Sequence, residues 1–340
     1  MKVRRFFLRL LPRLGIFVLS VLLLSVLTFY ISRLAPGDPL VSYYGDRVEK
    51  MSPAEREWAE DKLGLNDPLP TQYARWFSRA LHGDFGISYK YKMDVLEVIR
   101  TRLPYTFRLG GLGFVLLFVL ALLLGALCAW KEDRPLDRIL CKLGTVTSCI
   151  PEFWLSLMLI LLFSVTLRWL PSSGAYSVGG DGGFADRAVH LILPVTVVVL
   201  GHLWYLEEQL ILADTGADVA MRLVEELRAD YVLLARSEGM GRAHIVLLQC
   251  LRNVLPSYLS LMAISVPHVM GGTYIVEAVF SYPGLGTLSY ESARYKDYNL
   301  LMVLCLLSGA AVIACSLLAQ AMNARLDPRL RPAEREVTSK

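Results

Sequence analysis

Four side chains that could take part in chemistry lie inside long apolar stretches: Glu152, His190, His202 and His268. An ionised carboxylate at the centre of a membrane helix costs about 2.5–3.5 kcal/mol, so Glu152 should face a protein interior or a wet cavity. It either lines a solute pathway or hydrogen-bonds backbone groups freed by Pro151. Each histidine is either a donor between helices or a contact for a solute. The four residues are spread over three stretches without catalytic spacing, which disfavours a membrane-embedded enzyme.

The motifs that bind nucleotide or activate water in soluble enzymes are absent. The sequence contains no Gly-Lys dipeptide, so it lacks the phosphate loop G-x-x-x-x-G-K-[ST], and it contains neither H-E-x-x-H nor G-x-S-x-G. Its six cysteines have no C-x-x-C spacing, which indicates neither a disulfide framework nor a zinc site. We therefore expect no catalytic residue, no metal site and no cofactor in this chain.

The composition is that of a membrane protein. Of 340 residues, 54% are apolar and 19% are charged, whereas soluble domains carry about 25% charged residues. The net charge of +4 excludes the dense positive field of a nucleic-acid-binding protein. These values predict an all-α protein that crosses a lipid bilayer several times.

Six apolar stretches are each close to the ~20 residues that cross a bilayer as a helix. The first could be a signal peptide, but its eighteen uncharged residues exceed the usual ~7–15 and no good cleavage site follows, so we expect a retained helix. Basic residues concentrate in the two tails and in loop 131–142, which places both termini in the cytoplasm. The stretches are Leu14–Ile31, Leu109–Trp130, Leu143–Leu167, Ala188–Leu206, Asn253–Val276 and Tyr298–Met322.

Two connections are long enough to fold. Residues 33–103 are expected to form a small helical extracytoplasmic cap, with a capping box at Ser52-Pro53-Ala54-Glu55 and a helix stop at Gly64. Two further helices are predicted in it, Thr71–His82 and Met93–Arg102. The expected organisation is a tail and first helix (1–32), the cap (33–103), a transmembrane core (104–322) and a cytoplasmic tail (323–340).

The second long connection, residues 207–252, is expected in the cytoplasm. Leu223, Leu227, Tyr231 and Leu234 recur at helical spacing and predict one apolar stripe. Gly239 ends this pattern, and a second helix is expected from residue 242 into the fifth crossing. The loop is thus predicted to be a helix, a tight bend and a helix.

The same loop carries a recognisable signature. Residues 230–240 read D-Y-V-L-L-A-R-S-E-G-M and residues 251–256 read L-R-N-V-L-P. They resemble the coupling signature of binding-protein-dependent ABC importer permeases, especially the dipeptide, oligopeptide and nickel branch. The stretches 34–39, 150–154 and 279–286 agree in order. A departure is Ser237-Glu238-Gly239, where the family usually has Ala-Lys-Gly, which bears on how the partner docks.

The resemblance implies a type I ABC importer permease fold in the cytoplasmic (inner) membrane of a bacterium or archaeon. The implied partners are a second related permease, two ATPases that bind ATP and Mg²⁺, an extracytoplasmic solute-binding protein and lipid, without nucleic acid. The implied ATPase-coupling residues are Asp230, Tyr231, Ala235, Arg236, Ser237, Glu238, Gly239 and Met240. Pathway candidates are Glu152, Trp154 and His268. Candidates for docking the binding protein, or for sealing the outer face, are Tyr282, Pro283, Gly284 and Gly286.

The resemblance leaves the solute open. Related permeases carry dipeptides, longer peptides, nickel, metal chelates or other small solutes, and peptide is the favoured expectation. A secondary transporter or channel is the rival class, but it would use inverted repeats or intramembrane charge pairs, and the sequence shows neither.

Overall fold

The computed structural model describes residues 2–35, 40, 44–130, 134–179, 182–203, 226–227 and 229–326. Within these residues the structure is helical apart from one isolated β-bridge, between Ile87 and Asp94. The chain divides into two compact units, each considered by itself. Unit 1 is Met1–Thr106 with Pro283–Ala314, and unit 2 is Phe107–Tyr282 with Cys315–Lys340.

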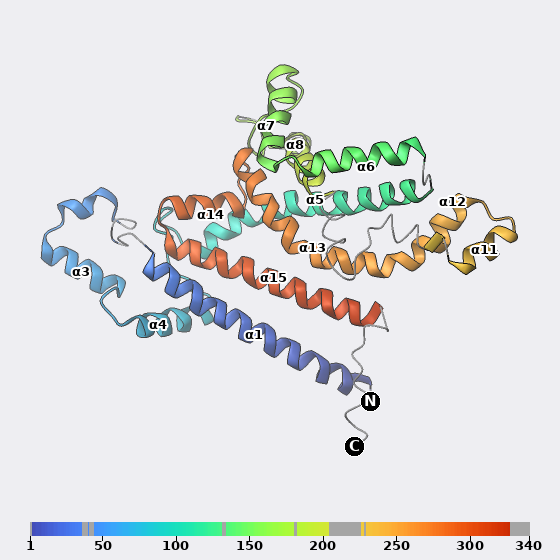
Figure 1. The fold of residues 1–340 in the computed structure, drawn as a ribbon. Helices are drawn as coiled ribbons and strands as arrows, with labels where there is room; N and C mark the ends of the chain where they lie inside the picture. The colour runs from blue at the N-terminus through green and yellow to red at the C-terminus, as the bar shows by residue number, and fades with distance from the viewer. Residues whose placement is uncertain are drawn as a thin grey trace. The chain divides into compact units, whose positions relative to one another are not determined.

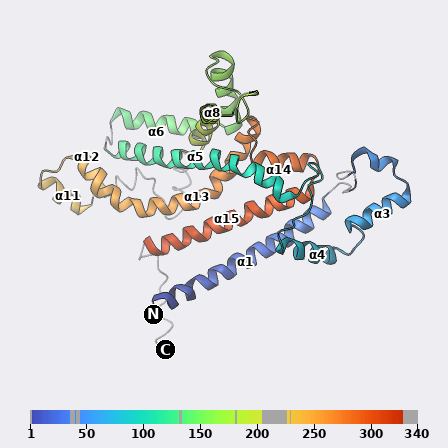
Figure 2. The same ribbon diagram turned by 180° about the vertical axis from the view of Figure 1, so that it is seen from behind.

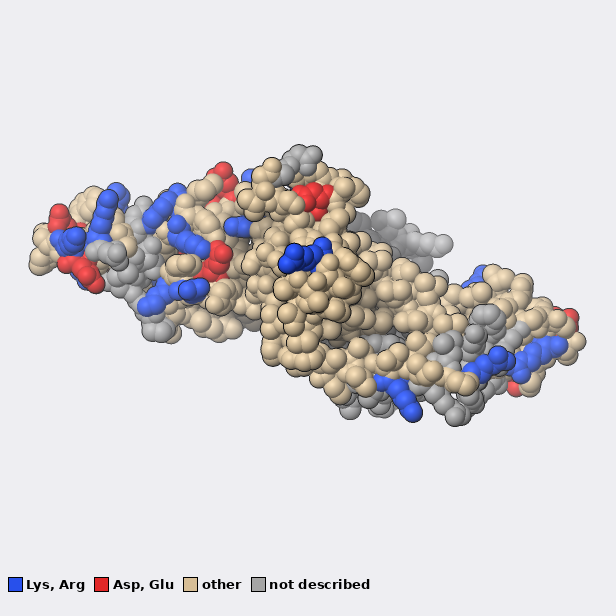
Figure 3. Space-filling view, turned by 90° about the horizontal axis from the view of Figure 1, so that it is seen from above, with Lys and Arg blue, Asp and Glu red and all other residues tan. Residues whose placement is uncertain are grey.

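Four described helices are long and apolar enough to cross a membrane. They account for the first, second, fourth and sixth predicted crossings and belong to α1 (Lys2–Leu34), α5 (Val95–Trp130), α8 (Phe184–Leu203) and α15 (Tyr298–Leu326). The surface agrees with lipid contact, since Figure 3 shows charged side chains gathered in patches that are separated by broad surfaces without Lys, Arg, Asp or Glu.

In unit 1, α1 and α15 lie side by side, as both Figure 1 and Figure 2 show. A glycine allows their close approach, because a Cβ atom at Gly309 would lie only 2.3 Å from Cδ2 of Leu24. The Ser32 hydroxyl reaches the Met302 sulfur at 3.8 Å from the other helix. These contacts set the spacing of the two helices.

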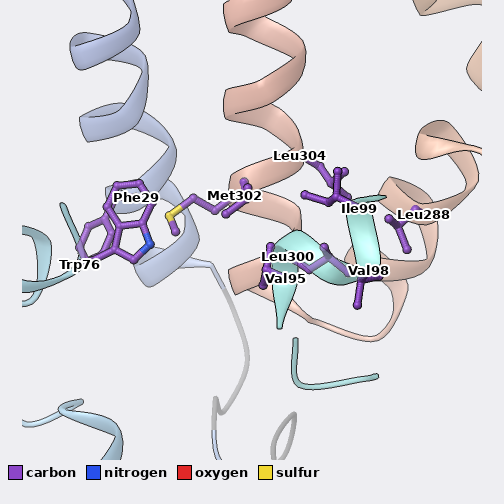
Figure 4. Close-up of a cluster of buried hydrophobic side chains, with 10 residues drawn as sticks. Phe29, Trp76, Val95, Val98, Ile99, Leu288, Leu300, Met302 and Leu304 are labelled. Carbon is purple, nitrogen blue, oxygen red and sulfur yellow. The ribbon is translucent and has the colours of Figure 1, made fainter. Parts of the chain in front are cut away.

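The core of unit 1 joins five helical segments of the chain. Phe29 of α1 stacks beside Trp76, and the Met302 side chain extends towards them (Figure 4). Val98 and Leu288 belong to the same buried cluster. The cap is therefore not a separate body, since its helix shares a core with α1 and α15.

The cap begins as the sequence predicts. Helix α3 (Pro53–Leu63) has the complete capping box between Ser52 and Glu55 and ends at Gly64, whose φ of 67° is left-handed. Helix α4 (Leu69–Leu81) matches the predicted second helix. A 3-10 helix, Gly45–Lys50, precedes α3.

The predicted separate helix Met93–Arg102 is wrong. Residues 95–102 are instead the beginning of α5, which continues through Pro104 to Trp130. A proline removes one backbone hydrogen bond to the preceding turn. Transmembrane helices tolerate this loss because neighbouring groups satisfy the freed carbonyl, so Pro104 does not end the helix.

Helix α14 (Leu285–Arg294), which the sequence did not predict, packs next to the segment 86–95. Asp297 fixes this arrangement from the turn between α14 and α15. Its side chain is fully buried and accepts hydrogen bonds from Ser88 Oγ at 2.5 Å and from the backbone N–H of Lys90 at 3.0 Å. A buried carboxylate with charge-assisted hydrogen bonds gives a strong, directional attachment.

A second attachment lies beside the first. Glu291 of α14 accepts hydrogen bonds from Lys90 Nζ at 2.6 Å and from the Tyr91 hydroxyl at 2.5 Å. Partial burial by itself raises the pKa of Glu291, but the hydrogen bonds from Lys90 and Tyr91 and the charge of Lys90 outweigh it, so the net pKa is lowered.

In unit 2, the third predicted crossing is broken. Helix α6 (Pro135–Ser148) ends before Pro151, and α7 (Glu152–Leu159) starts after it and continues as a π-helical segment, η2 (Ile160–Thr166). The ring of a proline disfavours the helical conformation of the residue before it. The apolar stretch therefore forms two helical pieces instead of one.

The rest of unit 2 is built around α13 (Leu251–Val279), which packs against α7 and α8. The Tyr258 hydroxyl donates a hydrogen bond to the carbonyl oxygen of Phe118 on α5. On the N-terminal side, α12 (Arg242–His244) and the π-helical segment η3 (Ile245–Cys250) lead directly into α13. This confirms the predicted second helix of the loop.

We predict that Glu291 makes the stability of the protein depend on pH. Because its folded-state pKa lies below the ordinary 4.5, ionised Glu291 stabilises the fold above that pH, and this contribution disappears as the pH falls through the lowered pKa. Thermal unfolding in detergent should show wild type more stable than Glu291→Gln at pH 7, with the difference shrinking towards pH 3. The matched control is Glu57→Gln at an exposed position. A difference independent of pH would contradict the assignment.

Candidate functional site

The predicted signature corresponds to one short helix and its turn. Helix α11 (Asp230–Ser237) ends in a tight loop in which Gly239 N–H bonds to the Arg236 carbonyl and Met240 N–H bonds to the Ala235 carbonyl. Gly239 has φ of +81°, a left-handed conformation that glycine adopts without strain. Neighbouring atoms would leave room for a side chain at Gly239, because a Cβ atom there would meet nothing within 4 Å. The preference for glycine therefore comes from the backbone conformation.

One face of α11 is buried. Val232 is fully buried and Ala235 is 3% exposed. Ile245 and Val246, in the first turn of η3, are also buried. Apolar side chains at i and i+3 share one face of a helix, so this pair fixes which way α11 faces.

The opposite face presents apolar and charged groups together. Leu233 and Leu234 are each 62% exposed. They continue into the exposed residues 236–239 and the half-buried Met240. Exposed leucines beside charges are typical of a surface that another protein covers. We call residues 233, 234 and 236–240 the coupling surface.

The predicted apolar stripe is wrong in detail. Leu234 is exposed and not buried, and the helix begins only at Asp230, because Ala229 before it has an extended backbone with ψ of 151°. Leu227 is buried, as predicted, but it lies before this break. Leu223 lies outside the described residues. The buried face is set by Val232 and Ala235, a different register of the same short helix.

A polar contact that sequence reasoning missed joins the start of α11 to α13. Glu226 accepts hydrogen bonds from the Tyr231 hydroxyl and from Asn253 Nδ2, the latter at 3.2 Å. The Tyr231 hydroxyl also lies 3.6 Å from the sulfur of Cys250. A second link joins the turn to η3, where Gln249 Nε2 lies 3.4 Å from the Met240 sulfur. No motif spacing signals these contacts, because they depend on the bend between the two helices.

The other predicted sites are not brought together with α11. Glu152 lies at the start of α7 and faces α8, where its Oε1 is 3.2 Å from Nδ1 of His202. Gly201 allows this approach, because a Cβ atom there would lie 3.0 Å from the Glu152 carboxylate. The other oxygen, Oε2, is buried without a hydrogen-bond partner among the described residues. Glu152 thus faces the interior of unit 2, one of the two environments expected for it.

The remaining candidates differ in exposure. Trp154 is 46% exposed, and the side chain of His268 lies outside the described part of α13. Tyr282 is 2% exposed, Gly284 is buried, and Pro283 and Gly286 are half-buried. In unit 1, the N–H of Leu285 donates to Thr106 Oγ1 at 2.7 Å. This hydrogen bond holds the first residue of α14, next to the four candidate docking positions.

The exposed side of α11 offers groups suited to contact with another protein. Its exposed groups are leucines, a guanidinium, a hydroxyl and a carboxylate, without a nucleophile paired to a base. Among the described residues no group of three or more His, Cys, Asp or Glu side chains could hold a metal ion. What the geometry offers is a small rigid surface attached to a long helix.

Comparison with known proteins agrees with this description. Residues 219–332 match the family described as the inner membrane component of binding-protein-dependent transport systems. Residues 3–110 match the N-terminal membrane component of the same systems. The chain belongs to this family, so it is a multi-pass inner-membrane permease component and not an enzyme.

Relatives cover almost the whole chain. The oligopeptide transport system permease protein AppB of Bacillus subtilis (strain 168) is 31% identical over 308 residues, which are 90% of this chain and 94% of AppB. A protein of Brucella suis biovar 1 (strain 1330), provisionally named a peptide permease, is 31% identical over 316 residues, 91% of this chain and 94% of its own. A Sinorhizobium fredii protein, provisionally named a peptide ABC transporter permease, is 28% identical over 309 residues, with 91% and 94% covered.

We predict that Gly239→Thr uncouples the permease. A left-handed conformation costs an L-residue about 1–2 kcal/mol, so the turn should rearrange and uptake should fall about tenfold, the change that 1.4 kcal/mol produces. Uptake in cells is measured together with the amount of permease in the membrane, which should stay unchanged.

The matched control is Gly241→Thr. Gly241 has no positive φ, and a Cβ atom there also meets nothing within 4 Å. It lies just before α12, where threonine is a suitable helix-capping residue. Equal uptake by the two variants would remove the backbone argument for Gly239.

Proposed function

We propose that the chain is one permease subunit of an ATP-driven importer, forming half of a translocation pathway for peptides delivered by an extracytoplasmic solute-binding protein. The observation that carries the proposal is the coupling surface: an exposed face on a helix whose other face is buried and whose turn is tied to η3, which leads directly into α13. A chain without a phosphate loop must receive the work of ATP hydrolysis through such a contact.

Six crossings fit the helices. Four are long apolar helices. The third would consist of the pieces α6, α7 and η2, and the fifth of α13, whose 29 residues are ample for a ~30 Å hydrocarbon core. An even number of crossings with basic tails puts both termini and α11 in the cytoplasm. The cap, 33–103, would then lie outside, followed by a transmembrane core, 104–322, and a cytoplasmic tail, 323–340.

The family description names the systems as binding-protein-dependent. This supports an extracytoplasmic binding protein as a partner, together with two ATPase subunits that hold ATP and Mg²⁺ and a second permease subunit. When the ATPases close on ATP, the coupling helices would be drawn with them. The permeases would then rock, and the cavity between them would open outward to receive solute and inward after hydrolysis.

Peptide is the proposed solute because the names of the relatives refer to oligopeptide or peptide transport. Nickel, a metal chelate or another small solute, carried by the same class of transporter, is the alternative. Glu152, Trp154 and His268 remain the candidate pathway residues. The loop 282–286 remains the candidate docking site for the binding protein.

Reconstitution tests the proposal. The complete transporter in liposomes should accumulate a labelled peptide only when ATP and the binding protein are both present, and ionophores that collapse ion gradients should not reduce uptake. Replacing the peptide by a nickel chelate in the same assay distinguishes the alternative solute. Uphill uptake by this chain alone, driven by an ion gradient, would instead establish a secondary transporter.

A further inference from the structure

The carboxylate of Glu226 holds together two elements that the chain itself joins only through a bend. It accepts one hydrogen bond from Tyr231 in the first turn of α11 and another from Asn253 in the first turn of α13. We call these two bonds the Glu226 tie. The three residues are separated by 5 and 27 positions in sequence, so the tie closes the whole coupling segment into a loop.

Both donors of the Glu226 tie carry a proton to donate at neutral pH. Burial is the main cause that raises the pKa of Tyr231, and the hydrogen bond to Glu226 raises it further. The tyrosine therefore keeps its proton and remains a donor. The amide of Asn253 is a second donor, and a carboxylate has enough acceptor sites for both. Hydrogen bonds to an ionised acceptor are shorter and stronger than neutral ones.

The position of the tie gives it a mechanical consequence. Glu226 lies before the extended residue Ala229, so without the tie the start of α11 would be held only by its apolar contacts and by the 3.6 Å contact of the Tyr231 hydroxyl with the Cys250 sulfur. A further link, from Gln249 of η3 to the Met240 sulfur, holds the turn that follows the other end of α11. One attachment at each end of a short helix resists rotation, whereas a single attachment does not.

The tie also connects α11 to the helix through which movement would reach the membrane. Asn253 belongs to α13, which packs against α7 and α8 and whose Tyr258 hydroxyl donates a hydrogen bond to the Phe118 carbonyl oxygen of α5. A displacement of α11 that is passed to α13 therefore reaches the transmembrane helices of unit 2. Coupling between distant sites is carried by such rigid, packed elements.

We propose that Glu226 is a positioning residue that fixes α11 to α13, so that movement of the coupling surface is converted into movement of the transmembrane helices. The inference rests on the proposed function. Glu226 does not need to contact the ATPase or the solute. It acts through Tyr231 and Asn253, and its removal would leave docking in place while movement is lost between α11 and α13.

The test uses the complete transporter in liposomes and three measurements: ATPase subunits co-purified with the permease, ATP hydrolysed, and peptide taken up per ATP. Glu226→Ala should keep co-purification and keep hydrolysis within about twofold, while uptake per ATP falls about fivefold, a change of the size that mutations along a coupling network produce. Glu226→Gln retains an acceptor oxygen for both donors and should restore most of the loss.

A second variant covers the case in which Glu226→Ala fails to assemble. Tyr231→Phe combined with Asn253→Ala removes both donors and leaves the carboxylate, so it should reproduce the loss of uptake per ATP. Normal uptake per ATP in this double variant, or in an assembled Glu226→Ala transporter, would overturn the proposal. So would a Glu226→Gln variant as impaired as Glu226→Ala. These failures differ from failure of the proposed function, in which the wild-type transporter itself shows no ATP-driven uptake.

Discussion

The attachment of α11 to η3 and to the start of α13 is the constraint on which the proposed function depends. If separate ATPase subunits supply the work, as we propose, a force applied to the surface of this chain has to move its transmembrane helices. Val232 and Ala235 turn one face of α11 inward, the left-handed Gly239 ends the helix sharply, and contacts at both ends hold it. The leucines on the other face are exposed.

Unit 1 shows the same principle at the predicted outer surface. Asp297 is buried where the segment 86–95 meets the turn after α14, and Glu291 adds a second attachment through Lys90 and Tyr91. The aromatic cluster around Phe29 and its neighbours joins the cap to α1 and α15. Helix α4 of the cap thus shares one core with α1 and α15 within this unit.

Caps and turns, which depend on neighbouring residues, could be predicted from the sequence, whereas features that depend on contacts between distant elements could not. The capping box at Ser52 and the stop at Gly239 were correct because each depends on residues within one turn. The continuation of α5 through Pro104 and the break at Ala229 were missed because neighbouring elements decide them. The Glu226 tie has no sequence signal, since Asn253, one of its two donors, lies 27 positions away. Membrane class and family were evident from apolar stretches and the signature.

Cross-linking from the coupling surface tests the central claim most directly. Ser237 is exposed at the end of α11, and Ser78 is exposed on α4 of the cap. A photo-cross-linking amino acid at position 237, in membranes that contain the complete transporter, should capture an ATPase subunit, and the yield should change when ATP is added. The same group at position 78 should capture none. An assembled transporter that gives no ATPase adduct from position 237, or equal adducts from both positions, would contradict the account.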